Sequence, residues 1–126
     1  MASLALRNMT KNTYERGIYA EQLAQNYLEE KGFVIVASRY RTPYGEIDLL
    51  MRDRDTLVAV EVKYRKYEID SFECLHIRQK KRIENALLFY ISENDLNSSL
   101  FRFDVVLLSA GKQITHLENA WQVDES

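Results

Sequence analysis

Apolar and polar positions alternate with two different periods along the chain, and each period predicts one type of element. From Tyr14 to Lys31, apolar residues recur at the three- and four-residue spacing of an amphipathic helix, and Gly32 follows as a stop signal. The same spacing predicts a second helix from about His76 to Ser92, which the polar cluster 93–95 ends. These two segments are the expected helices of the domain.

Short runs of apolar and β-branched residues predict five strands around these helices. Turn residues at 42–45 and a polar break at 53–56 separate the first three, and the break has the length of an antiparallel hairpin loop. The resulting order, αβββαββ, predicts an α/β protein of the α+β kind with a mixed sheet. We expect residues 1–12 to be a loose tail, 65–75 an irregular connection and 13–126 a single domain. The predicted strands are 33–37, 46–52, 56–63, 101–108 and 113–117.

Composition narrows the class of protein. A chain of 126 residues with 46% apolar residues can bury a core of its own. Its single cysteine excludes an internal disulfide framework, and no apolar run is long enough to cross a membrane or to act as an export signal. A cytoplasmic protein with no membrane partner is therefore expected.

The formal net charge of −2 conceals an uneven distribution of charge. Residues 38–82 carry 11 Lys/Arg against 8 Asp/Glu, whereas residues 83–126 carry 2 against 7. If some carboxylates of the middle segment hold a divalent cation, the field there becomes more positive and suits a phosphate-bearing partner. Ordinary mixing of surface charge is the alternative interpretation.

The predicted hairpin brings candidate catalytic groups together. A loop centred on residues 54–55 places Asp48 opposite Glu61 and Glu46 opposite Lys63. The Cβ atoms of such cross-strand pairs lie about 4.5–5.5 Å apart, so two carboxylates can converge on one hard cation. The sequence thus predicts a Mg²⁺ or Mn²⁺ site on the hairpin.

A solvated sheet face is the competing interpretation of the same pattern. Strand alternation turns Ile47 and Leu49 away from Asp48, and Glu46 with Lys63 would then form an exposed ion pair of little energy. Against this, phosphodiester hydrolysis needs a cation beside its metal and water, and Lys63 supplies one. Periodicity alone leaves both interpretations open.

Four motifs together resemble a known family. The chain reads GEIDLL at 45–50, VEVKYR at 60–65 and RFDVV at 102–106, after a Gly-x-x-Ala-Glu-x-x-Ala start to the first helix at 17–24. This combination resembles the YraN-like bacterial proteins, which are regarded as restriction-endonuclease-like members of the PD-(D/E)xK superfamily. The resemblance covers nearly the whole chain from Tyr14 and implies a restriction-endonuclease-like core.

The resemblance implies a metal-dependent nuclease that acts on DNA, such as branched or single-stranded DNA. Asp48 and Glu61 would bind Mg²⁺ or Mn²⁺, the backbone carbonyl of Val62 would add an oxygen ligand, and Lys63 would orient the water or stabilise the phosphate. The chain departs from the pattern in having no proline before Asp48, and in Arg78 where the family has lysine. A catalytically silent module that binds nucleic acid or protein is the alternative, and a homodimer is also possible.

Two residues on the helices extend the candidate site. Glu21 borders the apolar stripe of the first helix, and it is either a further metal ligand, as in many superfamily members, or an ordinary glutamate at the solvent edge. Gln79 lies on the inward face of the second helix and resembles the helix glutamine of RecB-like nucleases, so it is a catalytic candidate.

Four residues mix cations with a ring and predict a nucleic-acid-binding surface. They are Tyr64, Arg65, Lys66 and Lys80. Bases stack on aromatic rings, and phosphates pair with ammonium and guanidinium groups. Ordinary surface tyrosines and a solvated helix start are the alternative.

Other conspicuous residues are interpreted as structural. Cys74 and His76 stand two apart with no third orienting group, which is a poor arrangement for a nucleophile. Asp104 interrupts an apolar strand and is expected to pair with a backbone group or with Arg102. Trp121 is expected to pack near the C-terminus.

Overall fold

The computed structural model describes residues 13–65, 77–109 and 113–123. The predicted order of elements is confirmed, and the first and last strands are longer than predicted. The expected tail at 1–12, most of the connection at 65–75, and with it Lys66, Cys74 and His76, lie outside the described residues. The elements are α2 (Thr13–Glu30), β1 (Val34–Arg41), β2 (Glu46–Asp53), β3 (Thr56–Arg65), α3 (Ile77–Glu93), β4 (Leu100–Ser109) and β5 (Ile114–Trp121).

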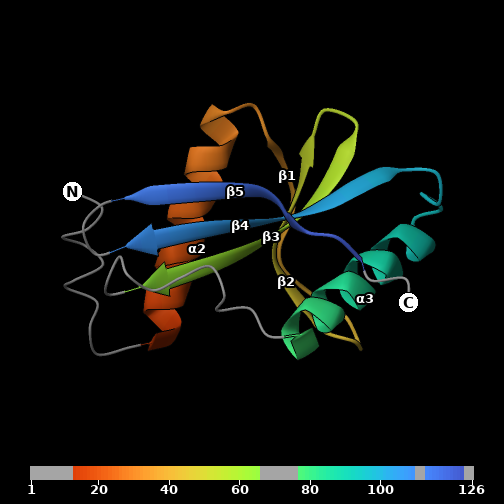
Figure 1. The fold of residues 1–126 in the computed structure, drawn as a ribbon, viewed down its shortest axis with the longest axis horizontal. Coiled ribbons are helices and arrows are strands. Elements are labelled where there is room, and N and C mark those ends of the chain that lie inside the picture. Colours follow the sequence, from red (N-terminus) through yellow and green to blue (C-terminus); the bar gives the residue numbers. More distant parts are fainter. Residues whose placement is uncertain (1–12, 66–76, 110–112, 124–126) are drawn as a thin grey trace.

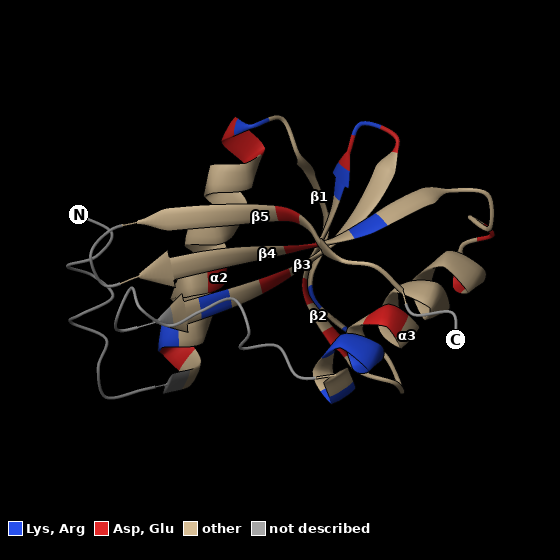
Figure 2. Cartoon of the chain, viewed as in Figure 1, with Lys and Arg blue, Asp and Glu red and all other residues tan. Residues whose placement is uncertain are grey.

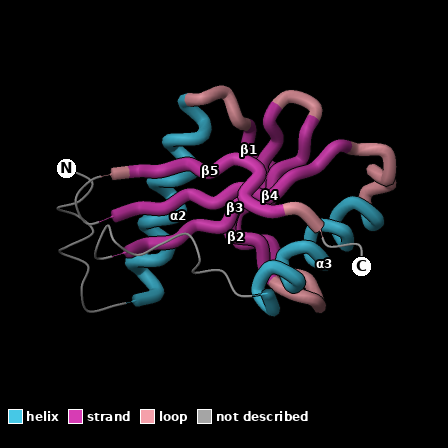
Figure 3. Tube along the Cα trace, in the orientation of Figure 1, coloured by secondary structure: helices cyan, strands magenta, loops and turns pink. Residues whose placement is uncertain are grey.

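The strands form one mixed sheet in the order β1-β2-β3-β4-β5 (Figure 3). All neighbouring pairs are antiparallel except β3 and β4, which run parallel because the chain passes through α3 between them. This α+β architecture is compatible with a restriction-endonuclease-like core. Among the described residues, no helix has both the length and the apolar character needed to cross a membrane.

The two helices cover opposite faces of the sheet (Figure 1). Helix α2 places Ala20, Ala24 and Leu28 against one face, in what we call the α2-side core. Helix α3 places Ile83 and Leu87 against the other, the α3-side core. Successive residues of β3 alternate between the two cores, as expected for a strand buried on both sides.

Gly32 ends α2 as the sequence predicted. Its φ of 98° lies in the left-handed region, which glycine adopts without a steric penalty. The N–H of Gly32 donates to the carbonyl of Glu29 at 3.0 Å, and the N–H of Phe33 donates to the carbonyl of Leu28 at 3.1 Å. These two bonds form a Schellman motif, in which Leu28 and Phe33 both join the α2-side core.

The turn between β1 and β2 is fixed by Thr42 and packs closely on α3. The Thr42 hydroxyl donates to the carbonyl of Gly45 at 2.8 Å and accepts from the N–H groups of Tyr44 and Gly45, both at 3.0 Å. A Cβ on Gly45 would lie 2.9 Å from Cβ and 3.0 Å from the carbonyl oxygen of Arg82. Only glycine therefore lets this turn touch the backbone of α3.

A backbone kink interrupts the alternation of β1 and β2. Arg39 has a φ of 50°, in the left-handed region. The ladder between β1 and β2 pairs Tyr40 with Ile47, so Arg39 lies opposite Asp48. Across the kink the strands change phase, so Ile47 joins the α3-side core while Leu49 joins the α2-side core. The prediction that Ile47 and Leu49 share a face is therefore wrong, because strict alternation assumes extended backbone throughout.

Candidate metal-binding and catalytic site

Strands β2 and β3 separate at the centre of the candidate site. Their ladder has the register that the sequence predicted, but it ends at the pair Leu49 and Val60. Beyond that pair, the Oδ2 atom of Asp48 accepts a hydrogen bond from the backbone N–H of Val62 at 2.8 Å. The side chain of Asp48 therefore joins the two strands where their backbone pairing stops.

Glu61 lies next to Asp48 and is almost fully buried, with 7% of its surface exposed. Burial raises the pKa of the Glu61 carboxyl, as do its hydrogen bond with Asp48 and the charge of Asp48, while the charge of Lys63 opposes these effects. The Nζ atom of Lys63 lies 4.0 Å from Oε1 of Glu61. The structure thus brings together the three residues that the sequence predicted for the catalytic centre.

Glu21 approaches this group from α2. Its side chain is 14% exposed. Burial, followed by the charge of Asp48, raises the pKa of Glu21 to about 7, although the neighbouring Arg39 guanidinium acts in the opposite direction. Glu21 therefore belongs to the same electrostatic cluster as Asp48, and it is not an isolated glutamate at the solvent edge.

Arg39 is the neighbour of this site that sequence reasoning missed. Its Nε donates to Oε1 of Glu21 at 3.0 Å and its Nη2 donates to Oε2 at 3.4 Å. Its guanidinium carbon lies 5.0 Å from the centroid of the Tyr14 ring, and Nη1 lies 3.9 Å from Glu46. The sequence places Arg39 between the apolar strand 33–37 and the acidic motif 45–50, and this position could have suggested a partner for a carboxylate. The periodicity of apolar residues does not report on such a residue.

Glu46 does not lie opposite Lys63 as predicted. It pairs with Arg41 across β1 and β2, where Nε of Arg41 lies 3.4 Å from its carboxylate, and it also faces Arg39. The cause is the separation of β2 from β3 before this position. The acidic neighbour of Lys63 is consequently Glu61, within the site.

The helix α3 candidates lie at its N-terminal end, where Lys and Arg gather (Figure 2). Gln79 is half-buried in the first turn of the helix. Lys80 is also half-buried, and its Nζ atom lies 5.7 Å from the centroid of the Trp121 ring. Trp121 stacks on Phe103, so its predicted packing role is confirmed.

The predicted nucleic-acid-binding residues do not form one group among the described residues. Tyr64 packs against the α2-side core, with the Arg16 guanidinium 5.9 Å from its ring centroid. Lys80 belongs to α3, on the opposite face of the sheet. Arg65 pairs with Ser109 at the end of β3, and Lys66 is not among the described residues.

The side chains of the site offer the type of donor atom, carboxylate oxygen, that a hard divalent cation prefers. Asp48, Glu61 and Glu21 offer carboxylate oxygens, which Mg²⁺ and Mn²⁺ prefer, and the first two are hydrogen-bond neighbours. In the described part of the chain, however, no three His, Cys, Asp or Glu side chains are gathered closely enough to hold a metal ion together. Glu21 is instead engaged by Arg39.

The fold and site define a small α+β protein with a cluster of carboxylates and one lysine where two strands of a mixed sheet separate. The chain belongs to the uncharacterised protein family UPF0102, the YraN family, whose model matches residues 20–108, so the predicted resemblance is confirmed.

Three relatives illustrate the similarity. A UPF0102 protein of Sulfurihydrogenibium sp. is 40% identical over 112 residues, which cover 87% of this chain and 96% of the relative. The proteins of Aliivibrio fischeri (strain MJ11) and Clostridioides difficile are 36% and 35% identical and are covered to 94% and 99% of their lengths, respectively, each over 87% of this chain.

Proposed function

We propose that this protein is a divalent-metal-dependent nuclease that hydrolyses DNA phosphodiesters at the cluster of Asp48, Glu61 and Lys63. The observation that carries the proposal is the convergence of two carboxylates from different strands beside one lysine ammonium. Burial and the neighbouring Asp48 raise the pKa of Glu61, so holding both carboxylates charged here is costly unless a cation is bound. A bound divalent cation would offset the repulsion between the carboxylates of Asp48 and Glu61.

Each residue has a specific part in the proposed mechanism. Asp48 and Glu61 would hold Mg²⁺ or Mn²⁺ with the carbonyl oxygen of Val62, and Glu21 would join them once Arg39 releases it. The bound cation would acidify a water molecule and neutralise charge on the phosphate. Lys63 would orient the attacking water or donate to a phosphate oxygen.

DNA is the proposed substrate, with branched or single-stranded forms to be tested first. The proposed contacts for the strand are Arg65 at the end of β3, Lys66 after it and Lys80 at the start of α3. Gln79 is the proposed catalytic residue of α3. A homodimer also remains a prediction, which light scattering of the protein would test.

The deciding experiment compares wild-type protein with Lys63→Ala on single-stranded, duplex, flap and four-way-junction DNA in Mg²⁺ or Mn²⁺. Lys31→Ala is the matched control, because it removes a lysine at the far end of α2, where its Nζ lies 3.1 Å from His116. We expect metal-dependent cleavage by the wild type and the control, and none by Lys63→Ala. Cleavage that survives in Lys63→Ala would overturn the proposed mechanism.

A silent binding module is the second candidate, and the ion pair between Glu21 and Arg39 favours it. That pair leaves one candidate ligand occupied by a guanidinium instead of a metal ion. In this case, the wild-type protein would bind DNA in gel-shift experiments with no cleavage in either metal.

A further inference from the structure

The face of α2 that borders the candidate catalytic site carries an exposed aromatic ring. Tyr14, Gly17 and Glu21 are three and four residues apart, so they lie on one face of the helix. This face lies against Arg39 of β1: Glu21 accepts two hydrogen bonds from its guanidinium, and a Cβ on Gly17 would lie 3.8 Å from its Nη2. Tyr14 is about 10 Å along the helix axis from Glu21, at a rise of about 1.5 Å per residue.

Arg39 holds the ring of Tyr14 in place. Its guanidinium carbon lies over the ring, 5.0 Å from the centroid. The guanidinium is fixed in turn by the carboxylates of Glu21, 3.0 Å away, and Glu46, 3.9 Å away. Tyr14 is nevertheless 61% exposed, so much of the ring surface stays open. The ring is therefore a preorganised aromatic surface at the edge of the site.

The surroundings of this ring suit a segment of a nucleic acid strand. Ile18, four residues after Tyr14 on the helix, is 40% exposed and extends the apolar surface. Arg41, two residues beyond Arg39 on β1, contacts Glu46 through Nε, and its side chain is 74% exposed, so its guanidinium can reach a phosphate. Single strands bind to such combinations, because bases stack on rings while phosphates pair with guanidinium groups.

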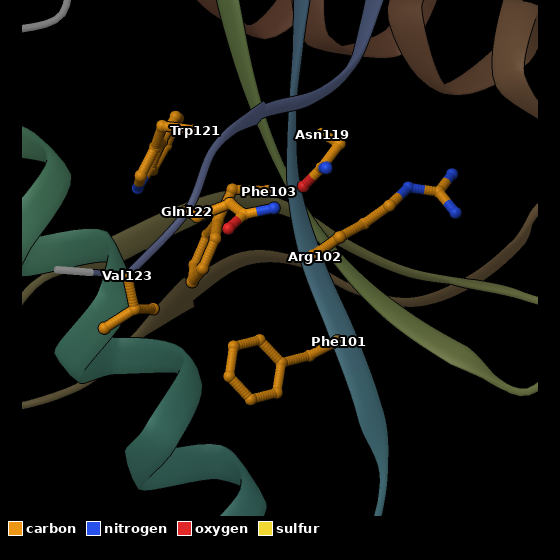
Figure 4. Close-up of a pocket in the computed structure, with 7 residues that line it drawn as sticks. All are labelled: Phe101, Arg102, Phe103, Asn119, Trp121, Gln122 and Val123. Carbon is orange, nitrogen blue, oxygen red and sulfur yellow. The ribbon is translucent and has the colours of Figure 1, made fainter. Parts of the chain in front are cut away.

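A second group of aromatic residues lines a pocket of about 240 Å³ between the start of β4 and the end of β5 (Figure 4). Its rings pack on one another, and Phe103 stacks on Trp121 with the ring centroids 4.9 Å apart. The guanidinium of Arg102 points away from these rings in Figure 4. Among the described residues that line this pocket, none combines a guanidinium with an open ring as Arg39 and Tyr14 do.

We propose that Tyr14 stacks on an unpaired base of the DNA strand that is cleaved, so that the substrate is a single strand or a flap. This inference rests on the proposed function, because it takes the carboxylate cluster as the point of cleavage. A base inside an uninterrupted duplex is paired and stacked between its neighbours, and it reaches the ring only by flipping out of the helix. A blunt duplex and a four-way junction with fully paired arms are therefore the poorer ligands.

Binding without cleavage tests the preference for an unpaired base. Fluorescence anisotropy with the Lys63→Ala protein in Mg²⁺ compares a single strand, a flap, a blunt duplex and a four-way junction of matched sequence. This variant keeps the carboxylates and is expected not to cleave. We expect the single strand and the flap to bind at least about fivefold more tightly than the two fully paired forms. Equal affinity for the four forms, or no binding of the single strand, would overturn the proposal.

Two substitutions of Tyr14 in the same background test the role of the ring. Tyr14→Ala should bind the single strand and the flap at least about fivefold more weakly, with little change for the duplex. Tyr14→Phe keeps the ring and should keep the preference. Circular dichroism melting checks that both variants fold, as expected for a position that is 61% exposed. A preference that survives in Tyr14→Ala would overturn the proposal.

Tyr44 provides the matched control. It is 57% exposed in the turn between β1 and β2, and its ring centroid lies 6.0 Å from that of Phe89 on α3. Tyr44→Ala should bind all four forms of DNA as its parent does. A loss equal to that of Tyr14→Ala would overturn the assignment to Tyr14, because any exposed tyrosine would then have the same effect.

Cleavage assays with the wild type separate this inference from the proposed nuclease. A preference for single strands that depends on Tyr14, in a protein that cleaves no DNA in Mg²⁺ or Mn²⁺, would overturn the nuclease and support the stacking site. Cleavage that depends on Lys63 but does not distinguish unpaired from fully paired DNA would support the nuclease and overturn the stacking site.

Discussion

The carboxylate of Asp48 accepts a hydrogen bond from the backbone N–H of Val62 at 2.8 Å, at the point where the ladder between β2 and β3 has ended. One oxygen of Asp48 therefore satisfies a backbone donor that pairing with β2 no longer satisfies. Its charge raises the pKa of neighbouring Glu61, as does their hydrogen bond. The side chain of Asp48 thus stabilises the junction of β2 and β3, while its charge disfavours the ionised form of Glu61.

Two substitutions of Asp48 should separate these effects. Asp48→Asn keeps an acceptor for Val62 and removes the charge beside Glu61, so its free energy of unfolding without metal should equal or exceed that of the wild type. Asp48→Ala leaves the N–H unsatisfied and should lose about 1–3 kcal/mol. Urea denaturation followed by circular dichroism measures both, and equal losses would contradict this account. Both variants should bind Mn²⁺ at least about tenfold more weakly in calorimetry.

Removing the Arg39 guanidinium should strengthen metal binding. Arg39 holds Glu21 through two hydrogen bonds, so a divalent cation must compete with it for that carboxylate. Arg39→Ala keeps a β-carbon at the left-handed position, which isolates the effect of the side chain. We expect Mn²⁺ affinity in calorimetry to rise about fivefold, the equivalent of about 1 kcal/mol.

Arg41→Ala is the matched control for this experiment. Arg41 contacts Glu46 at 3.4 Å with a side chain that is 74% exposed, whereas the guanidinium that bonds Glu21 is that of Arg39. Its loss should leave Mn²⁺ affinity close to that of the wild type. A similar gain in both variants would mean that general charge, and not release of Glu21, controls metal binding.

Most of the fold could be predicted from the sequence because local rules determine it. Helix periodicity with the Gly32 stop gave α2 to within one residue at each end, and the hairpin loop at 54–55 gave the register of β2 on β3. The faces around Asp48 could not be predicted, because no local pattern announces the left-handed φ of Arg39, whose side chain contacts Glu21 and Tyr14 of α2. The approach of Asp48 to Glu61 followed from the hairpin register, whereas the presence of Arg39 and the position of Glu46 did not.

Because Gly45 lies close to α3, we predict that any larger side chain at this position overpacks the contact between the turn and the helix. In Gly45→Ala, the new methyl group would lie 2.9 Å from Cβ of Arg82, with helix backbone just behind it. The turn or α3 must shift, and we expect a loss of about 1–3 kcal/mol in the free energy of unfolding in urea. Gly17→Ala is the control, because its methyl group would meet only Nη2 of Arg39 at an ordinary 3.8 Å. An alanine within α2 should instead stabilise the protein by about 0.5–1 kcal/mol.

A buried network around Asp104 makes a prediction about pH. Asp104 is fully buried and accepts hydrogen bonds from Arg102 at 3.0 Å and from the N–H of Asn119 at 2.9 Å, so the predicted pairing with Arg102 is confirmed. Nε2 of His116 lies 2.8 Å from its other oxygen, and Nδ1 of the same ring lies 3.1 Å from Nζ of Lys31. If the Lys31 ammonium donates to Nδ1 of His116, a neutral imidazole carries its proton on Nε2. That N–H then donates to Asp104.

These contacts decide the sign of the pH dependence. Burial alone would raise the pKa of Asp104, but hydrogen bonds from His116, Arg102 and Asn119 outweigh it and hold the pKa below the ordinary value of 3.8. Between those two values the unfolded chain binds more protons than the folded one. This contribution to the free energy of unfolding is therefore complete above pH 3.8 and is lost as the pH falls through the lowered pKa.

Asp104→Asn should remove this pH-dependent stability. We expect its free energy of unfolding to be about 1–3 kcal/mol lower at neutral pH and to change less steeply with pH in the acid range. Urea unfolding at a series of pH values measures both quantities. Asp55→Asn, at an exposed position of the β2–β3 turn, should keep the wild-type slope. Parallel curves for Asp104→Asn and the wild type would show that Asp104 is not the group whose protonation destabilises the fold in acid.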